Sequence, residues 1–349
     1  MMKILTNTTK ITMAILLMGV LILPTSCKKE LLDLTPTDLL ASENFWKTDE
    51  DATIALMAAY ASARAVFDRD YYFDGQGAEF TRVRGNSGTA GQILRGDAYQ
   101  AGSYGPSGYG ASFDKYFSYL YGSVNRSNYV IENITNKMLP TATGAKLASL
   151  ESIIAEARLL RGMTYFRLIS MWGDVPYISK IIYDNSEVTA LARMPIGQVK
   201  DSIMADFNYA VAKLPNKAAA LGRSGKPAAL AFRGKLNLYW GSWKKNGWPE
   251  LEGFTQNAGE ATTAFAAAAA DFKSVINDFG LTLYKNGDPG QIDALGKADI
   301  LPNYFELFTP KANGNPEMLM VFTHSGTPTN PSQGEELMRD FSGRTIEGS

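Results

Sequence analysis

The segment from Ala145 to Trp172 constrains the fold of this chain more than any other, because it carries the longest apolar pattern at helical spacing. A second apolar stripe widens the first, so we expect the helix to be buried on more than one side. Gly173 and Pro176, in the following WGDVP, end the pattern. The two stripes comprise Ile153, Ala157, Leu160, Thr164, Leu168 and Met171, and Ile154, Leu159, Met163 and Phe166.

Helical patterns dominate the rest of the chain as well. Further helices are predicted from Thr48, from Ser112, over 196–214, from Lys226 and over 257–280. The segment NPEMLMVFT, at 315–323, predicts a short strand, and no internal sequence repeat is evident. The predicted fold is mainly α, with antiparallel helix pairs, long loop insertions and a minor β-strand.

The N-terminus has the three parts of a secretory signal peptide. Lys3 and Lys10 precede the apolar run ITMAILLMGVLIL, and small residues follow it up to residue 26. The only cysteine, Cys27, directly follows these small residues. The sequence around it resembles a bacterial lipoprotein cleavage site, except that Pro24 stands where Leu is usual. We therefore expect residues 1–26 to be removed, Cys27 to be lipidated and residues 27–47 to form a tether. The alternative is an ordinary signal peptide with an incidental cysteine.

Composition argues against several classes of protein. The 34 basic and 35 acidic residues form no basic stripe of the kind that binds nucleic acid. A single cysteine excludes an internal disulfide, and His324 is the only histidine, so a histidine-based catalytic site would have to use it. Asp288 and Asp293 lack the spacing of an EF-hand calcium loop. We expect neither a cofactor nor a metal site.

A long segment rich in Gly, Ser and Tyr, at about 68–112, is the candidate ligand-binding region. Long loops in compact domains are usually functional or disordered. Sugars present flat C–H faces that stack on aromatic rings, and hydroxyls that bond to polar side chains. The alternative is that many of these tyrosines pack the loop onto the body or against a partner. The candidates are Tyr71, Tyr72, Arg82, Arg84, Asn86, Tyr99, Tyr104 and Tyr109.

Several segments resemble, in order, those of the SusD/RagB family of outer-membrane lipoproteins from Bacteroidetes. The segment EARLLRGMTYFRLISMWGDVP, from Glu156 to Pro176, resembles the family's hallmark helix. GKPAALAFRGKLNLYWGSW (225–243) and NPEMLMVF (315–322) resemble two further hallmarks, and ENFWKTDEDATIALMAAY and the Cys27 site also fit. Family members are usually longer, so residues 48–349 are expected to form a SusD-like binding domain that is incomplete at its C-terminus.

The resemblance implies tetratricopeptide-like helical pairs that support a loop-rich binding face. It implies a non-catalytic receptor, lipid-anchored in the outer membrane at the cell surface, which captures an oligosaccharide and passes it to a SusC-like TonB-dependent transporter. A peptide ligand, a surface-anchored glycoside hydrolase and an adaptor that binds only protein remain alternatives. Within the hallmark segment we expect a scaffold role for Glu156, Arg158, Arg161, Gly173, Asp174 and Pro176.

Overall fold

The computed structural model describes residues 45–67, 113–248, 250–285, 306–307 and 314–323. These residues are mainly helical, as predicted, and short π or 3-10 turns occur at 134–138, 139–141, 185–187 (η4) and 252–254 (η5). The α-helices of this part of the chain are α3 (Asp49–Phe67), α7 (Phe113–Asn133), α8 (Gly144–Trp172), α9 (Ile196–Lys213), α10 (Lys226–Asn246) and α11 (Ala258–Asp278).

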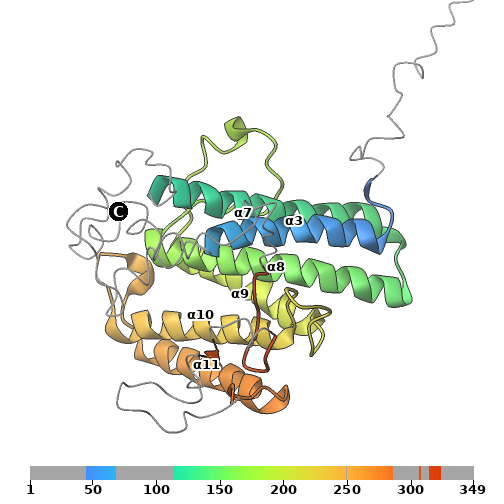
Figure 1. Cartoon of the computed structure of the whole chain (residues 1–349). Coiled ribbons are helices and arrows are strands. Elements are labelled where there is room, and N and C mark those ends of the chain that lie inside the picture. Colours follow the sequence, from blue (N-terminus) through green and yellow to red (C-terminus); the bar gives the residue numbers. More distant parts are fainter. Residues whose placement is uncertain (1–44, 68–112, 249, 286–305, 308–313, 324–349) are drawn as a thin grey trace, which may run out of the picture. The chain divides into compact units, whose positions relative to one another are not determined.

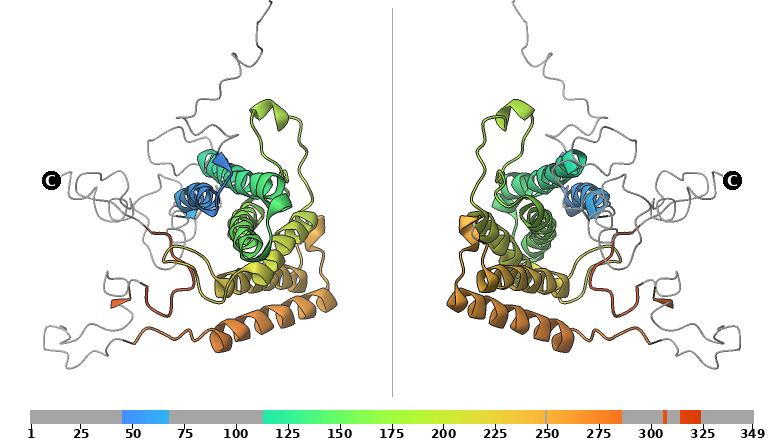
Figure 2. Two further views of the ribbon diagram at one scale, coloured as in Figure 1. Left: turned by 90° about the vertical axis from the view of Figure 1, so that its right-hand side faces the viewer. Right: turned by 90° about the vertical axis from the view of Figure 1, so that its left-hand side faces the viewer.

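Each helix packs chiefly on the next one along the chain, and α3 also contacts α8. Figure 1 shows α3 with α7, then α8 with α9, then α10 with α11. In Figure 2, α3, α7 and α8 are seen nearly end-on while α11 is seen lengthwise, so the last pair is rotated relative to the first. Successive helix pairs stacked with a rotation are the arrangement of tetratricopeptide-like folds, which confirms the predicted fold class.

The helices alternate in direction, so their ends gather at two ends of the array. At one end Trp46, just before α3, has its ring 5.6 Å from that of Tyr129 near the end of α7. At the other, the rings of Phe117, in the first turns of α7, and Trp172, the last residue of α8, are 5.2 Å apart. The Lys200 ammonium of α9 lies 4.9 Å from the Trp240 ring of α10. The helices α7 and α9 begin at the same end of the array at which α8 and α10 finish. We call this the Trp172 end.

An Arg-Gly pair facing an Asp-Phe pair occurs twice in this array. Arg161 of α8 donates to Asp206 of α9 from Nε (2.8 Å) and Nη2 (2.7 Å), and from Nη1 to Asn128 Oδ1 of α7 (2.8 Å). Arg233 of α10 repeats all three bonds, to Asp271 of α11 (2.9 and 2.6 Å) and, from Nη1, to an Asn208 oxygen of α9 (3.0 Å). The structure thus corrects the expectation that the chain has no internal repeat.

The glycine after each arginine lets the paired helices approach closely. A Cβ at Gly162 would lie 2.6 Å from the Phe207 ring, and a Cβ at Gly234 would lie 2.7 Å from the Phe272 ring. Real Cβ atoms do not come so near, so only glycine fits at these two points. Each repeat therefore combines an Arg–Asp ion pair with a phenylalanine ring packed on a glycine. We call the two repeats the α8–α9 rung and the α10–α11 rung.

The prediction of a short strand at 315–323 is wrong for the residues that the structure describes. Residues 315–323 contain turns and irregular backbone, and Val175–Met194 is the one isolated β-bridge in the described part. The apolar residues of this segment pack on a helix instead of a sheet. Phe322 stacks on Phe67 of α3 at 5.8 Å, and Arg64 donates to the Thr323 carbonyl (2.9 Å). Side-chain contacts with α3 thus hold the segment, and no partner strand for it occurs among the described residues.

Candidate functional site

The sequence-predicted ligand residues all fall in 68–112, which lies outside the described residues, as do Cys27 and His324. The described residues that border this segment are Phe67, the last residue of α3, and Phe113, the first of α7. Because α7 begins at the Trp172 end, the chain returns from 68–112 to that end of the array. The candidates themselves, Tyr71, Tyr72, Arg82, Arg84, Asn86, Tyr99, Tyr104 and Tyr109, stay predictions.

Glu156 of the hallmark segment is the centre of a buried polar cluster that joins three parts of the chain. The residue is only 1% exposed, and its carboxylate accepts hydrogen bonds from the Tyr60 hydroxyl of α3 (2.6 Å) and from Arg223 Nε (2.7 Å). The Ser224 amide also donates to it (3.3 Å), which fixes the loop before α10. Burial, and then the neighbouring Glu156 charge, raise the pKa of Tyr60 well above its ordinary value. This phenol is therefore a fixed donor that does not titrate near neutral pH.

Arg158 and Arg161 lie one turn apart and both reach Asp206 of α9. Arg161 binds it in bidentate fashion, whereas Arg158 Nη1 lies 3.8 Å from it. The Arg158 guanidinium also lies 4.3 Å from the centre of the Tyr209 ring, a cation–π contact. The sequence analysis assigned both residues a scaffold role without naming their partners. Their partners in the structure are mostly side chains of other helices, because the residues lie mid-helix, where the backbone is already paired.

The WGDVP segment ends one helix and starts another. Gly173, at φ +67°, donates its amide to the Ile169 carbonyl (3.1 Å) and closes α8. Asp174 accepts from the Ile196 amide (2.8 Å), an otherwise unpaired donor at the start of α9. The Pro176 carbonyl accepts from the Tyr121 hydroxyl of α7 (2.7 Å). These contacts position the connection that leads from α8 towards η4.

A polar ladder on α7, which the sequence analysis did not identify, holds this connection in place. Asn125 pairs with both backbone groups of Ile182 at 2.8 Å, and Asn128 donates to the carbonyls of Ile178 (3.0 Å) and Lys180 (2.8 Å). Figure 1 shows the connection rising past α7 to η4. The signal was available in principle, since Tyr121, Asn125, Asn128 and Glu132 share one helical face at spacings of four, three and four.

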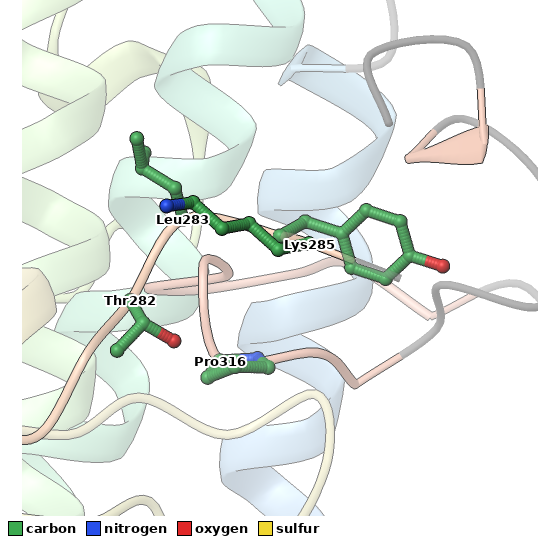
Figure 3. A pocket seen from close by; sticks show the side chains of 5 residues that line it. Thr282, Leu283, Lys285 and Pro316 are labelled. Atoms are coloured by element: carbon green, nitrogen blue, oxygen red, sulfur yellow. The ribbon is translucent and has the colours of Figure 1, made fainter. Parts of the chain in front are cut away.

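Three hollows open beside the segments 281–285 and 314–323, and two of them also border the loop before α10. The largest, about 730 Å³, lies between residues 216–223 and 314–321, and a second, about 370 Å³, lies between α3 and Thr323. A third, about 590 Å³, is shown in Figure 3 between Thr282–Lys285 and Pro316. No Asp, Glu, His or Cys occurs among the described residues that line them. The described lining thus offers apolar contact and cationic or amide groups, without a pair of carboxylates.

No three His, Cys, Asp or Glu side chains in the described part of the chain are placed to hold a metal ion. Among the helices given above, none combines the length and apolar character needed to cross a membrane.

The stacked helix pairs define a tetratricopeptide-like helical scaffold, and the comparisons with known proteins agree. A SusD-like family model described as starch-binding, associating with the outer membrane, matches residues 77–238. The SusD-like protein P2 of Formosa agariphila is 26% identical over 220 residues, which cover 61% of this chain and 41% of that protein. Over these residues the chain is similar to SusD-like proteins.

Two solved structures share the fold. One, described as a laminarin-binding SusD-like protein, is 23% identical and has a TM-score of 0.52. The match covers 79% of this chain and 51% of that protein's chain. The other, described as a complex with a xylogluco-oligosaccharide, is 22% identical with a TM-score of 0.55 and covers 82% and 50%. The chain spans about half the length of these solved structures and less than half that of P2.

Proposed function

We propose that this protein binds an oligosaccharide at the cell surface, without catalysis, and delivers it to a SusC-like TonB-dependent transporter. The observation that carries the proposal is the match of residues 77–238 to the SusD-like family model, together with the glycan ligands named for two fold neighbours, laminarin and a xylogluco-oligosaccharide. The helical array acts as a rigid support, and the segment 68–112 supplies the ligand face through Tyr99, Tyr104 and their neighbours.

The described residues also favour binding over hydrolysis. Hydrolysis of a glycosidic bond ordinarily uses two carboxyl groups separated by a fixed distance across a cleft. Three of the buried carboxylates among the described residues are instead bound by arginines: Glu156 by Arg223, Asp206 by Arg161 and Asp271 by Arg233. Carboxylates held in this way serve to join the helices of the scaffold.

The test is a binding and turnover measurement on the full chain in detergent. Laminari- and xylogluco-oligosaccharides are titrated by calorimetry, and the same mixtures are then analysed for shortened sugars. We expect binding with unchanged sugar length, and weaker binding after Tyr99→Ala or Tyr104→Ala. Shortened products would instead indicate a glycoside hydrolase. Absence of binding to a broad glycan panel, with binding to peptides, would indicate the peptide-binding alternative.

The membrane location is part of the same proposal. Lipidation of Cys27 would anchor the protein in the outer membrane, because each buried methylene of an acyl chain contributes about 0.8 kcal/mol. A fatty-acid label that persists after Cys27→Ala would contradict this. Purification of the tagged protein from its own cells should recover a TonB-dependent barrel protein as its partner.

A further inference from the structure

We propose that an exposed tryptophan at the Trp172 end forms a second sugar-stacking surface, separate from the predicted ligand segment 68–112. It consists of Trp248 supported by Trp243 and Phe254, which we call the Trp248 ledge. Trp248 is 46% exposed as a residue. Such a large, rigid ring left open to water is the kind of group that binds the flat C–H face of a pyranose ring.

The ledge is fixed in place by a stack of rings. Trp243, in the last turn of α10, stacks on Phe254 with ring centres 4.6 Å apart and planes inclined by 12°. Trp248 meets Trp243 edge-on, at 5.9 Å and 82°. Phe254 is itself buried and also lies against Trp240 and Tyr239, at 5.6 and 6.1 Å. The exposed ring is therefore the outer member of a cluster that extends into the core.

The backbone that carries the ring is also tied down. Gly247, at φ +76°, donates its amide to the Trp243 carbonyl (2.7 Å) and turns the chain out of α10. The Trp248 amide donates to the Phe254 carbonyl (2.9 Å), and the Trp248 carbonyl accepts from Leu251 (3.2 Å). A ring ordered before binding loses little conformational entropy when a ligand arrives.

Polar groups that suit sugar hydroxyls lie on the same turn. Lys245 and Gln256 are exposed, and the Gln256 side-chain amide donates to the Lys245 carbonyl (2.9 Å). The Gln256 Cβ lies beside Gly247, at 3.2 Å from where a Cβ on that glycine would be. Lys245 and Gln256 thus supply an ammonium group and an amide oxygen for which the hydroxyl groups of a sugar are suitable partners. The ligand class that fits a bare ring flanked by such groups is a neutral oligosaccharide.

The ledge belongs to the Trp172 end of the array. Leu251 lies against Gly173, its side chain 3.5 Å from where a Cβ on that glycine would be, and Trp240 lies against the first turn of α9. The chain enters α7 from 68–112 at this same end, where Phe117 contacts Trp172. A glycan held by the predicted loop could therefore extend to the ledge, which would add a contact to chains of several sugar units and none to short ones.

The inference rests on the proposed function for its ligand class, and the test separates the two. Trp248→Ala in the full chain is compared with Tyr183→Ala, a change of another exposed aromatic residue near η4. We expect Trp248→Ala to weaken binding of long laminari- or xylogluco-oligosaccharides by at least about fivefold, and of their disaccharides by less than about twofold. Trp248→Phe should retain part of the affinity, and Tyr183→Ala should leave the affinity unchanged.

Each result has a distinct meaning. Unchanged affinity for long oligosaccharides in Trp248→Ala, with clear binding by the unaltered chain, overturns the ledge and leaves the proposed function intact. No binding of any sugar by the unaltered chain contradicts both. Unchanged sugar affinity with loss of a co-purifying membrane protein would assign the ledge to a protein contact instead. Equal melting temperatures for the unaltered chain and for Trp248→Ala would verify that the fold is retained.

Discussion

Arg161 and Arg233 make the same three hydrogen bonds, but they lie at different depths in the molecule. The side chains of Arg161 and Asp206 are 6% and 3% exposed, against 24% and 8% for Arg233 and Asp271. Removing one partner of a buried pair leaves an uncompensated charge and costs about 3–5 kcal/mol. We expect Arg161→Ala to lower the free energy of unfolding by that amount, and Arg233→Ala by about 1–2 kcal/mol.

Urea unfolding of the two single variants measures this difference directly. The double variant Arg161→Met with Asp206→Leu removes both charges and should recover most of the loss, because apolar residues of similar size can replace a buried pair. Equal losses of unfolding free energy in Arg161→Ala and Arg233→Ala would show that burial does not determine how much each Arg–Asp pair stabilises the protein.

At this scale the sequence identified the residues but not their partners. Arg161 was assigned to a scaffold from its place in the hallmark segment. Its partners Asn128 and Asp206 lie 33 and 45 residues away and carry no local mark of the pairing. Long-range pairs of this kind depend on how the helices stack, which no local pattern specifies.

Among the helices, a matched pair of glycines tests the close approach of α8 and α9. Gly162→Ala would place a Cβ against the buried Phe207 ring, whereas a Cβ at Gly122 of α7 meets nothing within 4 Å. We expect Gly162→Ala to destabilise the protein by about 1–3 kcal/mol through overpacking. Gly122→Ala should instead stabilise it by about 0.5–1 kcal/mol, because alanine is the better helix former.

Thermal unfolding followed by circular dichroism measures both changes. Adding Phe207→Leu to Gly162→Ala makes room for the new methyl group and should recover part of the loss. If Gly162→Ala proved as stable as the unaltered chain, the contact between Gly162 and Phe207 would not limit the approach of the two helices.

Helices could be predicted well from the sequence because their apolar spacing is local. The prediction of a strand at 315–323 failed, because a short apolar run fits a strand and a segment packed on a helix equally well. The repeat of Arg-Gly and Asp-Phe was missed for another reason. Arg161 and Arg233 are embedded in different neighbours, and only their common geometry makes the likeness visible.

At the level of the whole molecule, the two rungs predict how the array unfolds. In stacked helical repeats each unit contacts mainly its neighbours, so stability is distributed along the array. Arg161 joins α7, α8 and α9, whereas Asp271 fixes only the last pair, through Arg233. A change at Asp271 should therefore loosen one edge of the array, while a change at Arg161 should loosen its centre.

Amide hydrogen exchange distinguishes these outcomes because it reports local opening as well as global unfolding. In Asp271→Asn we expect faster exchange in α11 and the second half of α10, with α7 and α8 protected as before. In Arg161→Ala we expect faster exchange from α7 through α9. Uniform acceleration over all described helices in both variants would mean that the array opens as one unit. In that case the rungs would act together, and the ligand segment and the Trp248 ledge would be held by a single cooperative support.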